Sequence, residues 1–159
     1  MTIAVYPGSF DPVTNGHLDI LNQSSKIFDK VIIAVANNIN KKSFLSLKER
    51  ITLIEKVTES FSNVEVDYFE GLTINYAVEK GANVLIRGLR SVSDFEYEYQ
   101  MAVTNSTLNA DIKTVFFAAN PTLSFISSSM VKEIYLNDGD ISDFVPKDVN
   151  DYLKSKRDI

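Results

Sequence analysis

The stretch Val31-Ile32-Ile33-Ala34-Val35-Ala36 decides the fold class of this chain. It is apolar at every position, which is typical of a strand whose two faces are both covered. Shorter apolar runs predict four further strands, at residues 3–6, 64–69, 84–86 and 114–118. Strands that alternate with longer segments of helical periodicity indicate an α/β fold with a parallel sheet.

The intervening segments carry apolar residues at helical spacing, and we expect helices at 16–28, 47–60, 72–80, 93–109, 127–136 and 147–156. Ser46 and Glu49 have the S-x-x-E spacing of a capping box, in which each side chain accepts from a free backbone amide. Gly81 is expected to end its helix in the left-handed conformation. Because crossovers between parallel strands are right-handed, we predict a Rossmann-like, doubly wound, five-stranded parallel sheet with helices on both faces.

The composition is that of a globular protein. The chain has 159 residues and a mass of 17.8 kDa, so we expect a single domain over residues 1–159. Its core should be large enough to fold without a disulfide bond or a structural metal ion. Hydrophobic residues are 45% and charged residues 23% of the chain, so disorder is not expected. Cysteine is absent, which excludes a disulfide scaffold, thiolate zinc sites and cysteine catalysis and favours a reducing compartment.

The net charge and the hydropathy of the chain argue against two classes of binding partner, nucleic acids and membranes. The formal net charge of −5 is a poor match to a nucleic-acid backbone or an anionic membrane surface. No apolar run approaches the ~20 residues that span a bilayer, and residues 1–6 carry no basic leader. We therefore expect a soluble cytoplasmic protein with no nucleic acid and no membrane as partner. A small basic pocket for a phosphorylated metabolite is compatible with this charge.

The loop after the first strand carries the first candidate chemistry, because ligands of parallel sheets lie at the carboxyl ends of the strands. Gly8 lets a ligand approach the backbone, and Ser9 adds a hydroxyl. Gly16 and His17 open a helix whose free amides favour an anion, and His17 is the sole histidine. The plainer interpretation is a helix capped by Asn15 with a histidine on the surface. No G-x-G-x-x-G and no Walker motif occurs, which argues against nicotinamide cofactors and P-loop hydrolysis.

Other strand ends add cations and hydroxyls. Lys41 and Lys42 follow the second strand, and Arg87 and Arg90 lie in an expected loop of residues 87–90 after the fourth strand. Serines at 124 and 127–129 precede or open the next helix. Taken singly, these are solvated lysines, an exposed arginine pair and capping serines. Together they predict one anion-binding rim, since the carboxyl ends of parallel strands share an edge.

The sequence resembles a known family at this point. Thr14-Asn15-Gly16-His17 matches the (H/T)-x-G-H motif of nucleotidyltransferases, and residues 126–132 match their I-S-S-[ST]-x-x-[RK] motif. Within that superfamily the chain is most similar to the bacterial phosphopantetheine adenylyltransferases. The stretches that carry this similarity are Tyr6–Pro12, Leu85–Arg90, Asp94–Glu98 and Ser124–Ser129. The resemblance covers essentially the whole chain.

The resemblance implies reversible transfer of AMP from ATP to 4′-phosphopantetheine, which gives dephospho-coenzyme A and pyrophosphate. It also implies a Mg²⁺ requirement, a homohexamer and feedback binding of coenzyme A, and it names no metal ligand. His17, Lys41 and Arg90 are the expected catalytic residues. The residues expected at 4′-phosphopantetheine are Ser9, Lys41, Thr73 and Arg87. Those expected at ATP are Ser9, Phe10, His17, Gly88, Leu89, Arg90, Glu98, Leu123, Ser124, Phe125, Ile126, Ser127, Ser128 and Ser129.

The implied chemistry needs positioning and positive charge more than acid–base catalysis. A phosphate dianion is already a nucleophile, so neither a general base nor a covalent intermediate is required. The residues by themselves leave three other functions open. One is a related transferase with a cytidyl donor or a nicotinamide mononucleotide acceptor. The second is a module that senses ATP or a coenzyme A metabolite, and the third is a purely structural α/β subunit. Adenine contacts in residues 120–123 are open too, since that stretch varies in the family.

Overall fold

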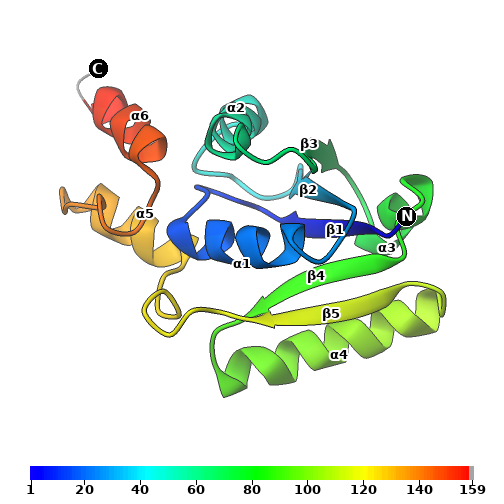
Figure 1. Cartoon of the computed structure of the whole chain (residues 1–159). Helices are drawn as coiled ribbons and strands as arrows, with labels where there is room; N and C mark the ends of the chain where they lie inside the picture. The colour runs from blue at the N-terminus through cyan, green and yellow to red at the C-terminus, as the bar shows by residue number, and fades with distance from the viewer. Residues whose placement is uncertain (158–159) are drawn as a thin grey trace.

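A five-stranded parallel sheet forms the centre of the structure, a computed structural model that describes residues 1–157. The strand order is β3-β2-β1-β4-β5, so the chain winds outward from β1 in both directions (Figure 1). The prediction of a doubly wound α/β fold is confirmed. The strands are β1 (Ile3–Gly8), β2 (Lys30–Ala36), β3 (Val64–Phe69), β4 (Val84–Leu89) and β5 (Lys113–Ala118).

Six helices connect and flank the strands, close to where periodicity placed them. The first begins at Asn15 and ends at Ser25, three residues before the expected end, and is followed by a short turn in which the amides of Ile27 and Phe28 both donate to Ser24 O. Gly81 has φ +64°, as expected after a helix. The helices are α1 (Asn15–Ser25), α2 (Leu47–Thr58), α3 (Thr73–Glu79), α4 (Val92–Leu108), α5 (Ser128–Leu136) and α6 (Lys147–Arg157).

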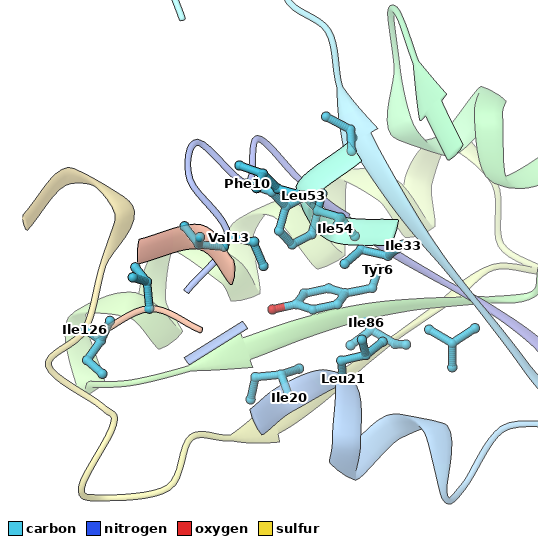
Figure 2. Close-up of a cluster of buried hydrophobic side chains, with 14 of the residues drawn as sticks. Tyr6, Phe10, Val13, Ile20, Leu21, Ile33, Leu53, Ile54, Ile86 and Ile126 are labelled. Atoms are coloured by element: carbon cyan, nitrogen blue, oxygen red, sulfur yellow. The ribbon is translucent and has the colours of Figure 1, made fainter. Parts of the chain in front are cut away.

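Two hydrophobic clusters lie on opposite faces of the sheet. The alternation of β2 divides it between them, with Ile33 in one cluster and Ile32 in the other. The larger cluster, which includes Leu21 of α1 and Ile54 of α2, is drawn in Figure 2. The smaller one packs against α3 through Ile74. Because β2 is buried on both faces, its unbroken apolar run is explained.

The segment after residue 86 differs from the prediction. Arg87, Gly88 and Leu89 were expected in a loop, but they extend β4 and pair with Phe116, Phe117 and Ala118 of β5. A charged residue beside a glycine has low strand propensity, and the backbone ladder offered by β5 overrides it. The extension fixes the backbone of residues 87–89, so the Arg87 side chain starts from a rigid strand. No helix among residues 1–157 is long and apolar enough to cross a membrane.

Candidate active site

A cavity of about 320 Å³ opens at the carboxyl edge of the sheet, and we call it the large cavity. Its walls come from the end of β1 and the loop after it, the start of α1, the end of β4, the start of α4 and residues 119–129. Among the residues expected at ATP, Leu89, Ser124 and Phe125 do not line it. The others do: Ser9, Phe10, His17, Gly88, Arg90, Glu98, Leu123, Ile126, Ser127, Ser128 and Ser129.

A second cavity of about 180 Å³, the small cavity, lies next to the first. Thr73 and Arg87, both expected at the acceptor, line it together with residues of α4. Pro7, Arg87 and Glu98 line both cavities and therefore form the wall between them. Two ligands, one in each cavity, would meet at this wall.

Lys41 lies apart from both cavities. It is exposed in the loop after β2, as is Lys42, and neither lysine is among the residues that line the large or the small cavity. The loop itself is anchored beside the site, because the buried Asp11 carboxylate accepts from the amides of Phe44 and Leu45 at 2.8 Å each. The structure therefore brings the base of the loop, but not its lysines, to the predicted rim.

His17 is held by an unusual capping box at the start of α1. Thr14 is the N-cap, not Asn15, and its Oγ1 accepts from the His17 amide. In return the Thr14 N–H donates to His17 Nδ1 at 3.0 Å. Since a backbone amide can only donate, Nδ1 must accept and the neutral ring carries its proton on Nε2. The site thus presents an N–H donor on the other side of the ring.

Electrostatics keep this imidazole neutral in the ligand-free protein. Burial, and after it the positive charges of Arg90 and Arg87, together lower the pKa of His17 to about 4. A cationic His17 is therefore not the resting state. The ring is also fixed from the side by Phe10, edge-on at 4.9 Å between ring centroids.

An NMR titration of the ligand-free protein tests this state directly, because the chain has a single histidine. We expect its imidazole signals to shift with a midpoint near pH 4, with the Nε2–H tautomer above it. The unfolded chain protonates near pH 6.5, so this group costs stability progressively as the pH falls from 6.5 towards 4. A midpoint close to 6.5 contradicts the assignment.

Arg87 and Glu98 form a two-pronged ion pair in the wall between the cavities. Arg87 Nε donates to one carboxylate oxygen at 2.7 Å and Nη2 to the other at 2.5 Å, while Nη1 donates to Pro7 O at 3.1 Å. Burial alone would lower the pKa of Arg87, but the Glu98 carboxylate outweighs it and raises the pKa above its usual value. Within residues 1–157, three of the five guanidinium protons have a partner, and two remain for a ligand.

Arg90 is oriented by two partners at the rim of the large cavity. Its Nε donates to Asp94 Oδ2 at 3.2 Å, and its Nη1 donates to Ile126 O at 3.1 Å. Asp94 also accepts from the Arg90 amide. In the sequence, Asp94 was noted only as the first residue of the stretch Asp94–Glu98 that carries the family resemblance, and it was given no role. An opposite charge four residues after Arg90 was the local signal that could have identified this pair.

Two helix starts lie side by side at the large cavity. A Cβ added at Gly16 of α1 would lie 3.7 Å from Ile126 O, which shows how closely the two segments approach. Ser127 caps α5, and the Ser128 hydroxyl donates to Pro12 O at 2.8 Å. Within residues 1–157 the amides of Ser128 and Ser129 have no partner. Free amides at a helix start are a natural anion site.

Two buried side chains, Phe10 and Arg50, hold the loop after β1 in place. Phe10 is 1% exposed and adopts a left-handed φ of +46°, so its ring is a core residue and only its backbone can reach a ligand. Arg50, 2% exposed, donates through Nη1 to Ser9 O at 2.8 Å and Ala36 O at 3.0 Å. Sequence reasoning missed Arg50, since a lone arginine inside an amphipathic helix carries no signal.

The carboxylates of the large cavity do not match the needs of a resident divalent metal. No group of three or more His, Cys, Asp or Glu residues that could hold a metal ion occurs in the part of the chain that the structure describes. Of the acidic residues that line the large cavity, Asp94 pairs with Arg90 and Glu98 with Arg87. These residues do not form a resident metal site.

Comparison with known proteins agrees with this geometry. The cytidylyltransferase-like family model matches residues 5–134. A solved structure from Vibrio parahaemolyticus, provisionally described as a nicotinate-nucleotide adenylyltransferase, superposes with a TM-score of 0.68 at 19% identity and covers 96% of this chain and 99% of its own. The chain belongs to the cytidylyltransferase-like nucleotidyltransferases.

Curated relatives define the group more narrowly. The phosphopantetheine adenylyltransferase of Alkaliphilus metalliredigens is 51% identical over 98% of this chain and 99% of its own length. That of Syntrophomonas wolfei is 54% identical over 98% and 97%, respectively. The chain therefore belongs to the phosphopantetheine adenylyltransferases, and the family resemblance seen in its motifs is confirmed.

Proposed function

We propose that this protein transfers the adenylyl group of ATP to 4′-phosphopantetheine, giving dephospho-coenzyme A and pyrophosphate. The observation that carries the proposal is the wall of Pro7, Arg87 and Glu98 shared by the two cavities. We assign ATP to the large cavity, where the free amides of a helix start favour an anion, and the acceptor to the small cavity. The acceptor phosphate then meets the α-phosphoryl group at Arg87, which has two free donors.

The residues of this chain act by position and charge. The acceptor phosphate attacks the α-phosphorus in line, and pyrophosphate leaves. His17 donates from Nε2 to the phosphoryl group, where negative charge builds up in the transition state. Arg90 and the amides of Ser128 and Ser129 are placed to hold the pyrophosphate portion. No residue needs to gain or lose a proton.

Mg²⁺ enters this proposal as part of the nucleotide substrate. Mg²⁺ keeps several waters and binds phosphate oxygens readily, so it can arrive on ATP without a cage of protein ligands. The engaged carboxylates of Asp94 and Glu98 fit that arrangement.

Pyrophosphate release from ATP and 4′-phosphopantetheine, with added Mg²⁺, tests the function. CTP as donor and nicotinamide mononucleotide as acceptor are the controls for the related transferases. Binding of ATP without release would favour the sensor alternative, and release only with a control substrate would reassign the enzyme. Dephospho-coenzyme A in the product mixture supports the proposal.

We also propose that the protein is cytoplasmic, that it binds coenzyme A as a feedback inhibitor and that it assembles as a homohexamer.

The exposed face of α4 supports the assembly. Of α4, only Glu98 is buried, and large apolar side chains stay exposed along the helix, including Val92 at 79% and Tyr97 at 61%. A second copy of the chain is the occupant we propose for this face, since exposed apolar patches mark interfaces. Coenzyme A shares its pantetheine arm with the acceptor, so it would compete for the same cavities. Light scattering measures the assembly.

Replacing Lys41 with alanine tests its proposed acceptor role. We expect the Kd for 4′-phosphopantetheine to rise about 10-fold or more, as for the loss of a hydrogen bond to a charged group, while the Kd for ATP stays within about threefold. The hydrogen bonds of Asp11 to the amides of Phe44 and Leu45 hold the base of the loop that carries Lys41 beside the site. Calorimetry with each substrate measures both constants. Lys42→Ala is the matched control and should change neither, and equal weakening of both ligands by Lys41→Ala contradicts the role.

A further inference from the structure

Tyr6 carries a polar group that the reaction above does not use. It lies near the end of β1 with 6% of its surface exposed, and it lines the large cavity. Its ring packs edge-on against Phe10 at 5.3 Å between centroids. In Figure 2 the side chain extends between Phe10 and Ile20, with its hydroxyl oxygen at the end nearer Ile126. These three neighbours are themselves cavity residues.

The Tyr6 hydroxyl forms no hydrogen bond to any of residues 1–157, although the residue is more than nine-tenths buried. It is not among the buried atoms that are sealed from solvent without a partner, which are Arg50 Nε and Asn150 Oδ1. The hydroxyl is therefore reached through the large cavity, the space that its residue lines. Phenylalanine would fill the same apolar site without an unpaired polar group, so packing does not explain a tyrosine here.

Two guanidinium groups and two carboxylates act on this buried hydroxyl. The positive charges of Arg87 and Arg90 act on it and favour ionisation, yet burial outweighs them and raises the pKa of Tyr6. The Asp19 and Glu98 carboxylates raise it further. The phenol consequently stays protonated and is a hydrogen-bond donor at any working pH.

We propose that Tyr6 is a substrate-binding residue whose hydroxyl donates a hydrogen bond to a phosphoryl oxygen of the bound nucleotide. The inference rests on the proposed function for the identity of that nucleotide. It adds a neutral donor from β1 to the donors of His17, Arg90 and the α5 amides. Because it acts from the floor of the cavity, it recognises the phosphoryl chain and not the base.

Tyr6→Phe removes only this oxygen. A hydrogen bond to a charged group corresponds to roughly 10- to 100-fold, so we expect kcat/KM for ATP to fall by that factor. The melting temperature should stay the same or rise, since no hydrogen bond within the protein is lost. Adenosine, which lacks phosphate, should inhibit the wild type and the variant with the same constant.

Tyr135→Phe is the matched control, because the Tyr135 hydroxyl donates to Leu153 O at 2.9 Å within the core and lies outside both cavities. It should lower the melting temperature and leave kcat/KM unchanged. Unchanged kinetics in Tyr6→Phe overturn the inference, and so does equal weakening of adenosine and ATP. If the wild type releases no pyrophosphate, the proposed function fails instead, and the Kd of ATP for the two proteins still decides the role of Tyr6.

Discussion

Replacing His17 with alanine lowers kcat by roughly 10²–10³-fold, the scale of losing one donor to a transition-state oxyanion, while the Kd for ATP changes by less than about threefold. The expectation follows from the ring geometry. Nδ1 is occupied by the Thr14 amide, so Nε2–H is free to meet the charge that develops on the α-phosphoryl group. The ground-state nucleotide keeps its other contacts, and binding therefore survives.

The alanine variant also removes the capping box, so its effect must be separated from a loss of stability. His17→Gln is the matched control, because glutamine at this position forms a standard capping box with Thr14. We expect His17→Gln to melt within a few degrees of the wild type and still to lose most of its turnover. Turnover close to normal in either folded variant removes His17 from the chemistry. Steady-state kinetics, ATP calorimetry and thermal melts give the three readouts.

The central strand of the sheet was predictable because a strand covered on both faces needs apolar residues at consecutive positions. Residues 31–36 are buried on both faces, and the resulting run identified the strand without ambiguity. The end of β4 was not predictable, since the pairing of Arg87 with Phe116 is a long-range contact that no local pattern records. Strand ends set by such ladders are decided by tertiary structure.

The site was predictable in outline for a topological reason. Parallel strands bring their carboxyl ends to one edge, so the loops with His17, Arg90 and the serines had to converge. The hydrogen bonds that the site residues form with one another were not predictable from the sequence. Glu98 lines the large cavity as expected, but the sequence did not show that both of its carboxylate oxygens accept from Arg87. The buried ring of Phe10 and the exposed position of Lys41 likewise depend on packing that the sequence does not show.

Arg87→Met has the second large expected effect, because it leaves the Glu98 carboxylate, 10% exposed, without its partner. Breaking a buried pair costs about 3 kcal/mol, the low end of the usual range, since the Arg87 side chain is 34% exposed. For a chain of this size that corresponds to a fall of roughly 6–12 °C in melting temperature. The kcat/KM for 4′-phosphopantetheine should fall by at least about 100-fold, because two charge-assisted donors to its phosphate are lost.

The double variant Arg87→Met/Glu98→Met separates these two effects. Removing both charges eliminates the unpaired carboxylate, so most of the lost stability should return. The donors toward the acceptor phosphate stay absent, and kcat/KM for 4′-phosphopantetheine should remain as low as in the single variant. If activity returned together with stability, Arg87 would be only a structural element of the wall between the cavities. If neither returned, the carboxylate would have a role beyond orienting the guanidinium. Recovery of the melting temperature alone identifies Arg87 as the residue through which the wall binds the acceptor.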